Sequence, residues 1–168
     1  MIIRICYRPF FFGLSVTKVS VIFTMVLVLA SSLAGCTSET EPLTENEIGD
    51  LAVVVTLDFR DQGNQTANLA ERLTDDSITF DPVFVAPNVT AYRVMEELQL
   101  RENFTIDVTY YVGMGAFVHT IDGVSGADDW STYWGFYDEG EMAEVGASTF
   151  PITSDVNISW ILTPAGDY

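Results

Sequence analysis

The chain has 168 residues, 24 of them acidic and seven basic, and its net charge at pH 7 is −17. All 24 acidic residues follow Cys36, and only four arginines and no lysine follow it with them. An acidic field of this kind repels nucleic acid and anionic lipid headgroups, so neither is expected as a partner surface. It suits either a high-salt habitat or an ordinary acidic exported protein.

Residues 1–35 have the layout of a prokaryotic lipoprotein signal. Three basic residues come first, an apolar run follows over 19–29, and small residues then lead to Leu-Ala-Gly-Cys, which ends at Cys36. This order is that of an export signal with its cleavage site. The apolar run is short beside the roughly 20 residues that cross a bilayer. A plain signal peptide and an uncleaved anchor are the alternatives.

From this layout we predict that Cys36 becomes the lipidated first residue of a protein held on the outer side of the cell membrane. Residues 36–50 are rich in Glu and Thr and poor in apolar residues, which predicts a disordered acidic tether. Cys6 leaves with the signal, so no disulfide or cysteine metal site is expected.

Residues 51–168 are predicted to form one α+β domain, an antiparallel sheet with one packed helix. The helix is expected over 90–100, where four apolar residues fall on one stripe and Asn88 or Thr90 caps the first turn. The segment 65–76 is a loop or a short helix, and Pro82 marks a sheet edge or a bulge. Strands are expected at 51–59, 77–85, 104–112, 116–121, 133–137 and 156–162.

Aromatic residues are concentrated in the run Tyr133-Trp-Gly-Phe-Tyr137. Because side chains alternate along a strand, part of this run must face outward. One interpretation places Trp134 and Phe136 in the core and leaves the two tyrosines half-exposed, as strand composition favours. The other is an aromatic platform for a flat ligand, a glycan or a protein, joined by Phe117 and Trp130.

Other candidate sites carry weaker signals. His119 is the sole histidine, and a solvated side chain is the alternative to a metal or corrinoid ligand. The acidic segment 122–129 suits either a solvated turn or a calcium loop that lacks the EF-hand spacing. We predict no metal site and no enzyme, because there is no nucleophile–base pair, GxSxG elbow or phosphate loop.

Four N-x-S/T triplets are candidate glycosylation sites, at Asn64, Asn88, Asn103 and Asn157. The alternative is that a chain rich in threonine contains such triplets by chance.

Four segments, in this order, resemble the β-grasp-like domain at the C-terminus of transcobalamin and intrinsic factor, a DUF4430-type domain. They are Thr90–Leu98, Phe117–Gly123, Tyr133–Tyr137, and Gly146–Ser148 together with Asp155–Trp160. Two turns depart from the family pattern, at Asp138-Glu-Gly140 and at Ser154-Asp155. The large helical barrel that holds the other face of the corrinoid in those carriers has no counterpart in this chain.

The resemblance implies a binding module for a cobalamin-like or other small flat ligand, with no cofactor required. The alternative is a cell-envelope module that binds protein or glycan without catalysis. The ligand-binding candidates are Phe117, His119, Trp130, Tyr133, Trp134, Phe136 and Tyr137.

Overall fold

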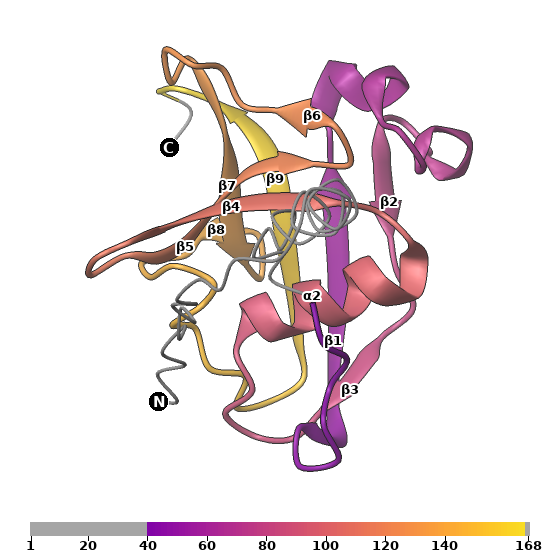
Figure 1. Ribbon diagram of the computed structural model, residues 1–168, viewed down its shortest axis with the longest axis vertical. Helices are drawn as coiled ribbons and strands as arrows, with labels where there is room; N and C mark the ends of the chain where they lie inside the picture. The colour runs from indigo at the N-terminus through magenta and orange to yellow at the C-terminus, as the bar shows by residue number, and fades with distance from the viewer. Residues whose placement is uncertain (1–39, 167–168) are drawn as a thin grey trace, which may run out of the picture. The chain divides into compact units, whose positions relative to one another are not determined.

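The computed structural model describes residues 40–166, which form two sheets and one α-helix (Figure 1). The predicted signal and Cys36 lie outside the described residues. Within 40–166, no helix is both long and apolar enough to span a bilayer. In chain order the elements are β1 Ile48–Asp58, the 3-10 turns η1 Arg60–Gln65 and η2 Ala70–Arg72, β2 Ser77–Thr79, β3 Val83–Val85, α2 Ala91–Glu102, β4 Ile106–Tyr111, β5 Gly115–Ile121, β6 Val124–Ser125, β7 Thr132–Asp138, β8 Glu141–Met142 and β9 Val156–Pro164.

The larger sheet has the order β2-β1-β9-β7-β8, and β3 also pairs with β1. Its centre is a parallel pair, β1 with β9, in which Val53 aligns with Val156 and Asp58 with Ile161. The remaining pairs of this sheet are antiparallel. The α+β class is therefore confirmed, but the sheet is mixed, because an alternating pattern shows which face a residue occupies and not the direction of its partner strand.

Helix α2 packs its apolar stripe into the core. Its buried residues include Val94, Met95 and Leu98, which join one cluster with alternate residues of β1 such as Val55 and Leu57. Thr90, one of the two predicted caps, accepts a hydrogen bond from the Arg93 amide at 3.4 Å. The helix is confirmed, and it extends to Glu102.

The predicted strand 77–85 is divided into β2 and β3, which both pair with β1. Pro82 lies in the gap, where it cannot donate a ladder hydrogen bond. The prediction of a single strand with an edge or a bulge at Pro82 is therefore corrected: two short strands flank Pro82.

The smaller sheet has the order β4-β5-β6 and is antiparallel. Strands β6 and β8 span two residues each and have no alternating pattern to predict them. The gap between β5 of this sheet and β7 of the larger one is where the candidate site lies.

The structure differs from the predicted tether over residues 40–50. Strand β1 begins at Ile48, and the residues before it lie against α2. The Arg93 side chain donates to the Glu47 carboxylate and to the carbonyls of Glu41 and Pro42. Composition predicted a solvated linker here because the acidic side chains gave no sign of their arginine partner, which is 46 positions away.

Candidate functional site

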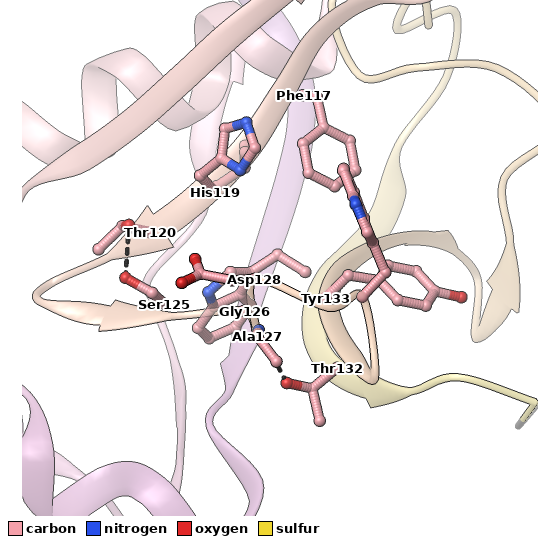
Figure 2. A pocket seen from close by; sticks show the side chains of 12 residues that line it. Phe117, His119, Thr120, Ser125, Gly126, Ala127, Asp128, Thr132 and Tyr133 are labelled. Carbon is pink, nitrogen blue, oxygen red and sulfur yellow. Dashed lines mark hydrogen bonds between the residues drawn. The ribbon is translucent and has the colours of Figure 1, made fainter.

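A hollow of about 250 Å³ lies between β5, β6, the loop over 126–131 and β7 (Figure 2). Five of the seven predicted ligand-binding residues line it: Phe117, His119, Trp130, Tyr133 and Trp134. These residues come from two sheets and a loop, so the fold brings together side chains that are up to 17 positions apart. We call this site the aromatic hollow.

A bulge in β5 shapes one wall of the aromatic hollow. Asp107 aligns with Thr120, and Val108 aligns with Val118, so His119 has no partner opposite it. Such a bulge breaks the alternation of the strand and redirects side chains. His119 and Thr120 are consecutive, yet both are half-buried and both line the hollow. The Thr120 hydroxyl hydrogen-bonds that of Ser125 on β6 at 2.8 Å (Figure 2).

The loop over 126–131 is attached to both neighbouring strands. The Gly126 amide donates to the His119 carbonyl at 3.1 Å, and the Ala127 amide donates to the Thr132 carbonyl at 3.0 Å. A Cβ at position 126 would lie 2.9 Å from the Thr132 oxygen and 3.0 Å from the Tyr133 Cα. Glycine therefore allows the loop to approach β7 closely.

Trp130 occupies a conformation that bulky residues rarely adopt. Its φ angle is +63°, and its amide closes a turn by donating to the Ala127 carbonyl at 3.0 Å. A left-handed backbone costs a residue with a Cβ about 1–2 kcal/mol. The side chain is 52% exposed all the same. A large exposed ring on such a backbone makes Trp130 a candidate functional position.

Three rings of the hollow lie close together, with their planes tilted relative to one another. The centroid of Phe117 lies 4.9 Å from that of His119 and 5.4 Å from that of Trp130, and His119 lies 6.2 Å from Trp130. The ring planes meet at 54–72°. Because the rings are inclined and not stacked, they leave ring surface for a ligand.

On β7, Trp134 and Phe136 point toward the core. Trp134 is 3% exposed, donates its indole N–H to the Val124 carbonyl at 3.0 Å and meets Phe59 edge-on at 5.2 Å. Phe136 packs on Trp160 at 5.0 Å. This arrangement agrees with the interpretation of the run that assigns these two residues to the core, although Trp134 also forms part of the wall of the hollow.

The two tyrosines of β7 have different surroundings, and both are half-buried. Tyr133 lines the aromatic hollow. The Tyr137 hydroxyl lies 3.0 Å from the Thr163 hydroxyl on β9, and its ring covers Gly135. Tyr137 is thus the one predicted candidate that lines neither the aromatic hollow nor the adjoining hollow beside Met114, Met142 and Val145.

A second hollow of about 300 Å³ adjoins the first and shares Phe117, Val118, Tyr133 and Trp134 with it. Phe136 lines this second hollow, together with exposed apolar residues that the prediction did not include: Met114, Met142 and Val145. The two hollows make a trough along the gap between β5 and β7.

Several polar residues near the site were not predicted. Thr120, Ser125 and Asp128 line the aromatic hollow. Ser125 and Asp128 belong to the acidic segment 122–129, for which the sequence suggested a solvated turn or a calcium loop and not a part of the aromatic site.

Asp128 and Asp129 are exposed, as expected for a solvated turn over 122–129, but Asp122 is an exception. It is fully buried, has a φ of +48°, and accepts hydrogen bonds from the Asn68 and Leu69 amides at 2.7 and 2.8 Å and from the Asn68 side chain at 2.9 Å. It thereby fixes the loop between η1 and η2 to the β5–β6 turn. Within 40–166, no three His, Cys, Asp or Glu residues are grouped to hold a metal ion.

The four candidate glycosylation sites are all exposed. Three of these asparagines also have structural roles. Asn88 and Asn103 adopt left-handed φ angles of +70° and +56°, which asparagine tolerates, and the Asn157 side chain donates to the Glu139 carboxylate.

The mixed sheet, the packed helix and the hollow define a β-grasp-like α+β domain with a candidate ligand site. Residues 88–163 are similar to the family model "Domain of unknown function (DUF4430)", in agreement with the resemblance that the motifs show. A search of curated proteins found no match.

Two solved structures are similar to the chain. One is the 1.30 Å crystal structure of a proposed metal-binding protein from Ruminococcus gnavus ATCC 29149, with 19% identity and a TM-score of 0.49 over 69% of this chain and 99% of that one. The other is haptocorrin in complex with Cbi, with 17% identity and a TM-score of 0.48 over 75% of this chain. This second similarity spans 28% of haptocorrin.

Proposed function

We propose that the domain is a binding module, without catalysis, that holds a small ligand against the rings of the aromatic hollow. The observation that carries this proposal is Trp130, whose ring is half exposed above a strained backbone and in contact with Phe117 and His119. Apolar ring surface with a few polar groups at its edge is the usual chemistry of a small-molecule site.

The size of the hollow limits how a corrinoid would bind. A volume of about 250 Å³ lies just below the range of roughly 300–1,000 Å³ that encloses drug-sized ligands. A cobalamin-like ligand, which the family resemblance suggests, would therefore insert one edge or side group and leave most of its surface outside. We expect weak binding for such a ligand.

We also propose, from the sequence of residues 1–36, that the module is displayed outside the cytoplasm by a lipid on Cys36. In that location its ligand would be an extracellular molecule.

The test is a titration of the purified full chain with cobalamin, followed by tryptophan fluorescence and by calorimetry. The proposal predicts binding that the Trp130→Ala substitution removes and that Tyr137→Phe, outside both hollows, leaves intact. Equal binding by the native protein and Trp130→Ala would reject the aromatic hollow as the site.

A second candidate function is docking of an envelope protein or glycan. The observation that favours it is the exposed apolar tip of the β4–β5 hairpin beside the trough, where Tyr110 is 63% exposed and Met114 is 60% exposed. Exposed apolar surface of this kind marks interaction sites. A pull-down from envelope extract with native protein and with Met114→Ser would identify partners that depend on the tip, and identical partner sets would reject this candidate.

A further inference from the structure

Positive charge is unevenly distributed over the described residues. All four arginines of 40–166 pair with carboxylates, and none lies beyond residue 101: Arg60 with Asp58, Arg72 and Arg101 with Glu102, and Arg93 with Glu47 and Glu96. Residues 103–166 contain nine acidic residues and no lysine or arginine. The part of the chain that builds the aromatic hollow therefore supplies no permanently charged cation to it.

The aromatic hollow combines two features that attract a cation. The faces of aromatic rings carry negative partial charge and bind ammonium groups within about 6 Å. Phe117, His119 and Trp130 provide such rings, and Asp128 adds a carboxylate to the same lining. In Figure 2 the Asp128 carboxylate and the Phe117 ring lie on different sides of the hollow.

The residues that line the hollow also favour one class of cation over another. Calcium and magnesium need several oxygen ligands, whereas an alkylated ammonium ion gives up little hydration when it meets a ring. The acidic groups of the lining amount to Asp128 alone, and the Thr120 and Ser125 hydroxyls bond each other at 2.8 Å. This lining suits an organic cation better than a metal ion.

We propose that the aromatic hollow selects ligands that carry an alkylated ammonium group, with the rings of Phe117 and Trp130 against its methyl groups and Asp128 balancing its charge. This proposal rests on the function proposed above and names the chemical class of its ligand. An anionic ligand would meet the opposite electrostatic environment, since the lining of the hollow contains Asp128 and no arginine or lysine to receive it.

The test compares choline with its neutral analogue, in which a tert-butyl group replaces the trimethylammonium group. The two have nearly the same shape and differ in charge. Calorimetry with the full chain in an uncharged detergent should give a millimolar Kd for choline and about fivefold to tenfold weaker binding of the analogue. Equal affinities, or no binding of choline, would overturn the proposal.

Two variants test whether the Asp128 carboxylate is the charge that attracts choline. Asp128→Asn should weaken choline about threefold to tenfold and leave the neutral analogue unchanged. Asp107→Asn removes the same charge from an exposed position on β4 outside the hollow, and it should alter choline binding far less. Equal effects of the two variants would mean that the general acidic field, and not Asp128, attracts the cation.

The outcomes separate this proposal from the proposed function. If cobalamin binds in a Trp130-dependent manner while choline does not bind, the cation proposal fails and the binding module stands. If neither cobalamin, choline nor the neutral analogue binds, both fail.

Discussion

The guanidinium of Arg93 on α2 lies 3.0 Å from the carboxylate of Glu47, the residue directly before β1. Glu47 also accepts hydrogen bonds from the Thr44 amide at 2.9 Å and the Thr44 hydroxyl at 2.8 Å. The pair connects the segment before β1 to the helix.

This pair predicts a specific dependence of stability on pH. The hydrogen bond from Arg93 lowers the pKa of Glu47 to about 2 from its ordinary value of 4.5. Because the folded-state pKa is the lower one, ionised Glu47 stabilises the fold above about pH 4.5, and this contribution is lost as the pH falls toward about 2. Glu47→Gln should reduce the free energy of unfolding by about 0.5–1.5 kcal/mol at pH 7 and by less at pH 3.

Urea unfolding at the two pH values measures this effect, with the exposed neighbour Glu45→Gln as the control. The same loss for both variants, or a loss for Glu47→Gln that does not change with pH, would contradict the role given to the pair.

Asp122 predicts a large effect from one buried carboxylate. Asp122→Ala removes the acceptor of three hydrogen bonds and leaves the Asn68 and Leu69 amides without it. A loss of about 2–4 kcal/mol in the free energy of unfolding is expected, because unsatisfied buried donors are costly and alanine also disfavours the left-handed φ.

Chemical denaturation checks this value, and Asp128→Asn, at an exposed position of the adjoining loop, should change stability by less than about 0.5 kcal/mol. Similar values for the two variants would show that Asp122 does not fix the loop.

The φ of Trp130 predicts that glycine is better tolerated there than alanine. Both substitutions remove the ring, so they lose the same contacts with Phe117 and His119. Glycine adopts a φ of +63° without strain. The free energy of unfolding of Trp130→Gly should therefore exceed that of Trp130→Ala by about 1 kcal/mol. Thermal or denaturant unfolding measures the difference, and the reverse order would contradict the strained conformation.

The predicted lipid anchor is tested at Cys36. Mass spectrometry of the mature protein should find an acylated N-terminal cysteine, and Cys36→Ser should release the protein from the membrane fraction. A native protein that begins at another residue, without acyl chains, would contradict this prediction.

Local chemistry explains which parts of the fold the sequence predicts. The helix follows from its apolar stripe and the Thr90 cap. Pro82 was expected to mark an edge or a bulge, but its missing amide donor divides the predicted strand in two. The parallel pairing of β1 with β9 joins residues about 100 positions apart, and no pattern within either strand specifies it.

The candidate site was predicted in part for the same reason. The rings of β5 and β7 were visible as residue types on strands, and five of the seven candidates line one hollow. The bulge at His119, the left-handed φ of Trp130 and the contacts of Asp122 with the Asn68 loop depend on tertiary structure. Without these tertiary features, the sequence could not predict that Asp128 lines the aromatic hollow or that Tyr137 does not.

The most direct test of the aromatic hollow follows the three tryptophan indole N–H signals by NMR while cobalamin or choline is added to the full chain. Trp130 is 52% exposed, whereas Trp134 and Trp160 are 3% and 1% exposed. The Trp130 signal should shift most and should saturate with at least one of the two ligands. A Trp130 signal that neither ligand moves would contradict it.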